Sequence, residues 1–346
     1  MWIEAVGQTV TIDGLTVKSA GRGIKIDEQY VDAPAKVTLN IANSTFETVK
    51  KAAILVKSVA GAEINVSDID ITKVTEDDDF AVWVDEDAAA YADKVVVNGA
   101  FIKVEGDASA AVASSATEIS EAIDAGATSI FLTEGEYVVP KSAKGMTVTF
   151  IGTGNPEDVK VGVTKVGTGG ENCDYGLDGS NATFENITIT TNSSTYIGYA
   201  RCSGTYKNCI INGTYTLYGD SVFEDCTFNV SGDVYNLWTW GAPTATFNNC
   251  TFNSDGKALL LYGQANTKLT VEGCTFNDNG GLTDLKAAIE IGNDYNKSYE
   301  LIVNDTVVNG YEINDKGINT GTTLWANKNS MPQDKLNVVV DGVDVY

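Results

Sequence analysis

The chain has 346 residues, no His, and a formal net charge of -24 from 23 basic and 47 acidic side chains. With 43% hydrophobic and 20% charged residues, it has the composition of a folded protein and not that of a disordered one. The negative charge disfavours nucleic acid and anionic lipid as partners. No apolar run has the length of a membrane span, and the N-terminal stretch "MWIEAVGQTV" lacks the basic region and apolar core of a secretory signal.

One short phrase recurs along almost the whole chain. In the copy "FNNCTF" the apolar side chains are Phe247, Cys250 and Phe252, and polar residues alternate with them on both sides of Asn249. Alternation with period two is typical of strands, and Asn, Asp and Gly tolerate the left-handed backbone of a sharp bend. The phrase therefore predicts a strand, a bend and a second strand, with both flanks facing one interior.

The same frame fits eleven copies, each with Asn, Asp or Gly at the bend. In chain order the bend residues are Gly14, Asn43, Asp68, Gly99, Asn186, Asn208, Asp225, Asn249, Gly273, Asp305 and Gly342. Most copies follow one another at about 20 to 40 residues, a period typical of solenoids. Each period holds short strands and no helical periodicity, which predicts an all-β, parallel β-helix solenoid of about 11 to 13 rungs. The shortest step, from Cys209 to Cys226, fits this pattern least well.

Four of the six Cys occupy the position directly after the bend: Cys209, Cys226, Cys250 and Cys274. An even number of Cys is also typical of disulfide frameworks. However, side chains at one position of stacked rungs point the same way at a spacing of about 4.8 Å, which is a poor geometry for bridging. Ile187, Thr306 and Val343 take this place in other rungs, so we predict a buried ladder of free thiols.

Two segments far apart in the chain resemble each other. "KAAILVK" begins at Lys51 and "KAAIEIG" begins at Lys286, and each precedes a segment with a single Trp, which is Trp83 or Trp325. A Val-rich copy of the repeat follows in both places. This correspondence predicts two tandem β-helix units, the first of which lacks its beginning.

The second unit is expected to begin with a cap. A capping box from Ser115 to Glu118 predicts a short helix near 115–125, and a helix covers the open end of a solenoid. The predicted organisation is the C-terminal part of a first unit, a linker and a complete second unit: residues 1–105, 106–116 and 117–346. The last residues read as a further rung, so we expect a neighbouring unit or subunit to cover that edge.

This repeat, with its short helix before the first strand, resembles the right-handed, pectin-lyase-like β-helix superfamily over nearly the whole chain. Enzymes of that superfamily cleave acidic polysaccharides with carboxylate-bound calcium and an Arg or Lys base, or with clustered Asp, a His and a basic pair. This chain has no His, and its Arg residues are Arg22 and Arg201. The resemblance therefore implies a right-handed coil and favours the non-catalytic surface and fibre proteins of this type.

An acidic run is the candidate metal site. Asp77, Asp78 and Asp79 supply the oxygen ligands that calcium prefers, although a solvated loop is the simpler interpretation. No other cofactor is expected.

A column of aromatic residues is the candidate carbohydrate-binding site. Its members are Tyr199, Tyr218, Trp238, Trp240 and Tyr262. The alignment continues at Ile291, and Ile289 and Ile291 flank a Glu290 that we expect to point outward. The column is therefore predicted to be an internal aromatic ladder. A column facing outward would instead be a platform for stacking sugars.

Together these features predict a non-catalytic β-helix segment for display, adhesion or carbohydrate contact. The expected location is extracellular, on a bacterial cell surface or a bacteriophage virion. The expected partners are a glycan or host surface and neighbouring β-helix units. One alternative is a polysaccharide lyase or glycoside hydrolase acting in a lateral groove, because the sequence does not set the separation of paired carboxylates. The other alternative is a purely structural spacer.

Overall fold

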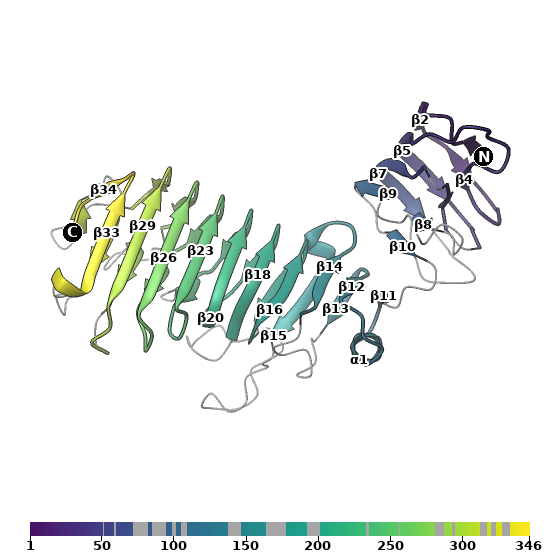
Figure 1. Ribbon diagram of the computed structural model, residues 1–346. Helices are drawn as coiled ribbons and strands as arrows, with labels where there is room; N and C mark the ends of the chain where they lie inside the picture. Colours follow the sequence, from purple (N-terminus) through teal and green to yellow (C-terminus); the bar gives the residue numbers. More distant parts are fainter. Residues whose placement is uncertain are drawn as a thin grey trace. The chain divides into compact units, whose positions relative to one another are not determined.

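The computed structural model forms two compact units, Met1–Val112 and Ala113–Tyr346, and the boundary between them falls within the stretch 106–116. Both units consist of stacked parallel strands, which confirms the all-β, parallel β-helix solenoid (Figure 1). The structure describes residues 1–50, 52–58, 60–71, 82–84, 95–98, 102–104, 109–137, 147–163, 178–191, 201–232, 235–255, 257–280, 287–292, 295–311, 317–319, 323–326 and 333–346.

In the first unit, successive turns of the chain add parallel strands to two sheets. One sheet has the order β1 (Trp2–Glu4), β4 (Ile24–Asp27), β6 (Ile54–Lys57), β8 (Val82–Val84) and β10 (Ile102–Val104). The other has the order β2 (Thr9–Asp13), β5 (Val37–Phe46), β7 (Ala62–Ile71) and β9 (Val95–Asn98), with β3 (Thr16–Val17) beside β5. Ile24, Ile54 and Val82 lie opposite one another in register and are fully buried, so the core is a stack of matching apolar side chains.

The second unit starts at the end of β11 (Ala110–Ala113) with helix α1 (Ala116–Asp124). The predicted cap is present, because the Ser115 hydroxyl accepts a hydrogen bond from the Glu118 N–H at 3.3 Å. The Glu118 carboxylate accepts a hydrogen bond from the Ser114 N–H at 2.6 Å. In a capping box the donor would be the N–H of Ser115, the next residue. Ile119 and Ile123 bury the inner face of the helix.

After α1, the strands lie side by side in chain order along the solenoid (Figure 1). One long sheet starts at β11 and continues with β12 (Ser129–Leu132), β14 (Thr149–Gly152), β16 (Asp178–Glu185), β18 (Arg201–Lys207) and β20 (Tyr215–Glu224). Beyond β20 it divides into two rows. The β22 row contains β22 (Leu237–Trp238), β25 (Lys257–Leu261), β28 (Ala287–Ile291) and β32 (Thr323–Ala326), with β31 (Gly317–Asn319) antiparallel to β32. The β23 row contains β23 (Thr244–Asn248), β26 (Thr267–Glu272), β29 (Tyr299–Asn304) and β33 (Leu336–Val340).

A second sheet of this unit carries the strands that follow the bends. Its order is β13 (Gly135–Tyr137), β15 (Val159–Val163), β17 (Thr188–Thr191), β19 (Ile210–Asn212), β21 (Thr227–Asn229), β24 (Thr251–Ser254), β27 (Thr275–Asp278) and β30 (Val307–Asn309). Two 3-10 turns, Pro156–Asp158 and Gln333–Lys335, precede β15 and β33. The short step from Cys209 to Cys226 is explained by β20, a single strand that pairs with both β22 and β23, so this rung has no separate turn between the rows.

Most of the predicted bends have the left-handed backbone; Asp68 lies within β7, and Gly99 lies outside the described residues. The described bend residues with positive φ are Gly14, Asn43, Asn186, Asn208, Asp225, Asn249, Gly273 and Asp305. Backbone N–H groups of bends pair with the next rung, as in the 2.9 Å hydrogen bond from Asn208 to the carbonyl of Glu224. The bend is therefore a stacked element and not a surface loop.

The prediction of a last rung with its bend at Gly342 is wrong. Asp341 and Gly342 both have positive φ, 47° and 77°, which is the conformation of a two-residue hairpin turn. β34 (Val343–Asp344) consequently runs antiparallel to β33 and does not stack on β30. The Val345 N–H donates to the Val338 carbonyl at 2.8 Å, so this chain itself pairs with the edge for which we expected a neighbour.

Aromatic ladders do fill the interior, but from other residues than the predicted column. Phe150, Phe184, Tyr206, Phe223 and Phe247 stack at centroid distances between 4.8 and 5.3 Å. A second stack on the bend-following sheet contains Phe228, Phe252 and Phe276 at 4.6 Å. On the outer side of that sheet, an amide ladder links Asn212, Asn229, Asn253, Asn277 and Asn309 by hydrogen bonds of 2.9 to 3.0 Å.

Candidate functional site

The register of the β22 row decides which side chains point outward. Tyr215, Leu237, Leu259 and Ile289 lie opposite one another and are buried in the core. Their chain neighbours Thr216, Trp238, Leu260 and Glu290 therefore lie on the outer face. Ile291 pairs with Leu261 and not with Tyr262, so the predicted alignment was displaced by one residue. The expectation that the aromatic column faces inward is accordingly wrong.

Four partly exposed aromatic side chains from three consecutive rungs gather on this outer side. We call Trp238, Trp240, Tyr262 and Tyr295 the aromatic corner. The ring centroids of Trp238 and Trp240 are 4.6 Å apart, and those of Trp240 and Tyr295 are 4.9 Å apart. Tyr262 lies 5.8 Å from Trp238 and 5.4 Å from Tyr295. Steep angles of 72° and 84° between neighbouring rings leave ring faces and edges turned in different directions.

Backbone contacts hold the aromatic corner in place. The Trp238 indole donates to the Tyr262 carbonyl at 2.6 Å, and the Tyr262 N–H donates to the Thr239 hydroxyl at 3.2 Å. A Cβ at Gly263 would lie 2.2 Å from the Trp240 carbonyl oxygen, so only Gly permits this close packing of the two turns. The corner is therefore positioned by its own rungs.

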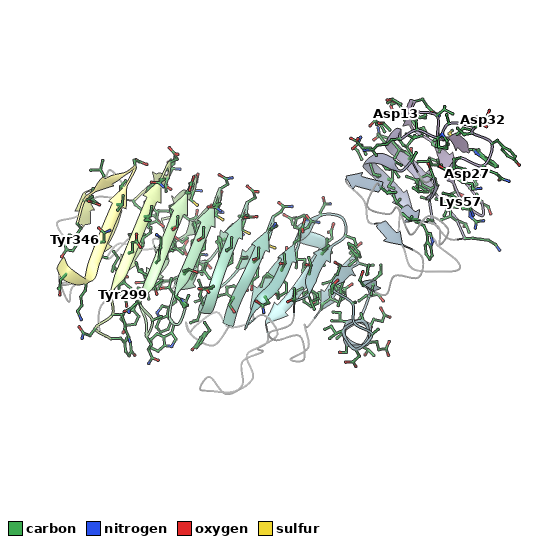
Figure 2. All side chains as sticks on the ribbon, in the orientation of Figure 1. Asp13, Asp27, Asp32, Lys57, Tyr299 and Tyr346 are labelled. Carbon is green, nitrogen blue, oxygen red and sulfur yellow. The ribbon has the colours of Figure 1, made fainter. Side chains whose placement is uncertain are left out.

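A polar groove of about 430 Å³ adjoins the corner. It lies where β26, β29 and β33 begin, and it is lined by Pro243, Asn266, Thr267, Lys268, Ser298, Tyr299, Glu300, Asp334, Lys335, Leu336 and Asn337. Tyr299, labelled in Figure 2, is a buried residue of this lining, and its hydroxyl accepts the Gly263 N–H at 3.1 Å. The Lys335 ammonium donates to Asn296, the residue after Tyr295, which connects groove and corner.

Three buried polar side chains lie beside Trp238 on the same outer face. Thr214, Thr216 and Asn236 are at most 1% exposed, and within the described ranges their side-chain polar atoms have no hydrogen-bond partner. Burying such groups without partners costs stability. Glu290 is also on this outer face, as expected, and is 8% exposed.

Several predicted residues lie elsewhere or outside the described residues. Tyr199 and the candidate calcium ligands Asp77, Asp78 and Asp79 are outside the described residues, and among those that are described no cluster of acidic or Cys side chains has the arrangement of a metal site. Tyr218 is partly exposed one rung before the corner, next to Gly241. Tyr295 was missed by sequence analysis, although it follows β28 much as Tyr262 follows β25, one rung earlier.

The predicted ladder positions form a buried row of free thiols: Cys209, Cys226, Cys250 and Cys274. Each Sγ lies within hydrogen-bond distance of two carbonyls, one two residues earlier and one in the preceding rung, as Cys250 does with Asn248 and Phe223. Burial raises the pKa of the Cys209 thiol, so this group stays protonated in the folded protein.

Trp83, the residue of the first unit that corresponds to Trp325, is buried. It lies within β8 opposite Leu55 and forms with Ala52 a small apolar cluster in which Trp83 is 2% exposed. In the second unit Trp325 takes the corresponding place opposite Glu290. The equivalent pairing agrees with a tandem origin of the two units, while the exposed aromatic corner was found in the second.

Comparison of the chain with family models, curated proteins and solved structures found no match. No helix in the described part of the chain is long and apolar enough to cross a membrane. The corner and the groove together combine partly exposed aromatic rings with amide, hydroxyl, ammonium and carboxylate groups.

Proposed function

We propose that this chain is a non-catalytic, pectin-lyase-like β-helix that binds carbohydrate through the aromatic corner and serves on an extracellular, cell or virion surface. The observation that carries the proposal is the gathering of Trp238, Trp240, Tyr262 and Tyr295 on the outer side of three rungs. Aromatic rings offer flat apolar faces that suit the C–H faces of pyranose rings, and polar groups beside them give orientation. A purely structural spacer would not require partly exposed Trp side chains.

The experiment is a glycan-array screen of the full chain, followed by titration of each hit against intrinsic Trp fluorescence. Trp240→Ala removes a ring that contacts the three other rings of the corner, so we expect at least about tenfold weaker binding, or about 1.4 kcal/mol. Tyr30→Ala is the matched control, because Tyr30 is an exposed aromatic residue of the first unit at 71% exposure. Equal losses in both variants would count against the corner, and no glycan binding would count against the proposal as a whole.

One observation favours polysaccharide cleavage as a second candidate function. The groove places the carboxylates of Glu300 and Asp334 in the same cleft as Lys268 and Lys335. Lysine and carboxylate groups together can provide acid-base chemistry. Product analysis of every glycan hit, with and without calcium, separates binding from turnover, and Glu300→Gln would abolish product if the groove were catalytic.

A further inference from the structure

The polar groove lies beside the aromatic corner on the same rungs. Its lining residues Pro243, Asn266 and Ser298 each follow a corner residue within a few positions of the chain, and Asp334 to Asn337 add one further rung. Its floor consists of residues just before or at the start of three stacked strands, such as Asn266, Ser298 and Asp334. The Ser298 N–H donates to the Asn266 side-chain oxygen at 3.0 Å, which ties neighbouring turns together. Stacked rungs repeat at about 4.8 Å, so similar polar groups recur along the groove at a spacing close to the length of one sugar residue.

The charges of the groove are already balanced. Lys268 and Glu300 form an ion pair at 3.3 Å, and the Lys335 ammonium is held by the carbonyl and side-chain oxygens of Asn296. Glu300 and Asp334 line the groove together with the two lysines, so the formal charges of its lining cancel. The formal net charge of -24 adds a repulsive long-range field for polyanions.

The remaining hydrogen-bonding groups suit hydroxyl ligands. Asn337, Ser298 and Asn266 are exposed in the groove and offer amide and hydroxyl groups. Such groups both donate and accept, as sugar hydroxyls do. An ionised ligand would also have to displace the Lys268–Glu300 pair, leaving a carboxylate uncompensated.

We infer that the groove binds a neutral oligosaccharide that lies along the solenoid axis, about one sugar residue per rung, with the aromatic corner beside it. This inference rests on the proposed function and adds the glycan class, its direction and the residues of a second contact region. It also differs from the acidic polysaccharides that the resemblance implies for related enzymes.

The test titrates the full chain with neutral cello-, manno- and chito-oligosaccharides of increasing length and with oligogalacturonate, at low and high salt. We expect a neutral series to bind with affinity that rises with length until the groove is filled and that changes little with salt. Asn337→Ala should lower the affinity for long oligosaccharides at least about fivefold and leave the affinity for short ones unchanged. Trp240→Ala should lower the affinity for both.

Two charge variants complete the experiment. Glu300→Gln releases Lys268 and should give the chain measurable, salt-sensitive binding of oligogalacturonate. Glu63→Gln is the matched control, because Lys36 and Glu63 form an ion pair of the same 3.3 Å length and similar exposure outside the groove. If Trp240→Ala abolished the binding of neutral oligosaccharides while Asn337→Ala changed the affinity at no oligosaccharide length, the groove would be ruled out as a binding site and the aromatic corner would remain. Oligogalacturonate binding by the unaltered chain would overturn the neutral class, and no binding of any glycan would overturn the proposed function with it.

Discussion

At the scale of single residues, the position after the bend explains why Cys recurs. The Cys250 Sγ donates across the bend to the carbonyl two residues earlier at 3.3 Å, and Ser44 and Thr306 make the same contact through their hydroxyls at 2.7 and 2.9 Å. A small side chain with one donor fits this place because the carbonyl faces the interior. The thiol adds contact with the preceding rung, so Cys serves here as a packing residue.

We expect Cys250→Asp to lower the free energy of unfolding by several kcal/mol, because it places a charge in a dry stack. Cys250→Val should cost less than about 1.5 kcal/mol, since it conserves volume. Urea unfolding measures both. A thiol reagent should leave the four ladder thiols unmodified in the folded chain and modify all of them in urea, and a disulfide between any two, seen by mass spectrometry, would contradict the ladder.

Thr216→Val should raise the free energy of unfolding by about 1 kcal/mol, because the buried Thr216 hydroxyl has no partner among the described residues and valine has the same shape. Thr267→Val is the control with the opposite sign. The Thr267 hydroxyl is also buried but donates to the Ala242 carbonyl at 2.7 Å, so its loss should destabilise by about 1 kcal/mol. If both variants changed stability in the same direction, the assignment of Thr216 as unpartnered would be wrong.

At the scale of elements, short local signals decide where strands and helices begin and end. Ser115 and Glu118 begin α1, and the Asp341–Gly342 pair closes the hairpin between β33 and β34. Both signals act within a few residues. The hairpin was nevertheless read as a rung, because Asp-Gly suits a bend and a two-residue turn equally well.

The cap of α1 should respond to pH. Hydrogen bonds from the Ser114 backbone and hydroxyl hold the pKa of Glu118 below its ordinary value of 4.5. A carboxyl with a lowered folded-state pKa stabilises the fold above that ordinary value, and the stabilisation is lost as the pH falls through the folded-state pKa. The unaltered chain should therefore have a higher urea midpoint than Glu118→Gln at neutral pH, and this difference should vanish in acid. A difference that persisted unchanged into acid would contradict this role of Glu118.

At the scale of the whole molecule, the chain consists of two solenoid units with separate cores. Each rung contacts its neighbours, so stability is close to a sum over rungs and their interfaces. The aromatic corner and the groove lie entirely on rungs of the second unit. Neither uses a residue of the first unit.

A chain of residues 113–346 should therefore fold by itself and keep the glycan affinity of the full chain. Calorimetry should show that this fragment unfolds at the temperature of one transition of the full chain, because its core contacts are unchanged. The fragment 1–112 serves as the comparison and should not bind glycan. A fragment 113–346 that is unfolded at room temperature would contradict the independence of the units.

The sequence by itself determined the bends, the stacked apolar positions, the helix cap and the solenoid, because a left-handed Asn or an alternating strand depends on residues that are neighbours in the chain. The tertiary structure decided which face each strand of the β22 row presents. That choice depends on pairing between rungs, and a displacement of one residue moves every side chain to the opposite face. Ile291 pairs with Leu261, and for that reason Tyr262 lies outside with Trp238 and Trp240 and not in the core. The groove likewise exists only where turns from three rungs meet, which no single stretch of the sequence specifies.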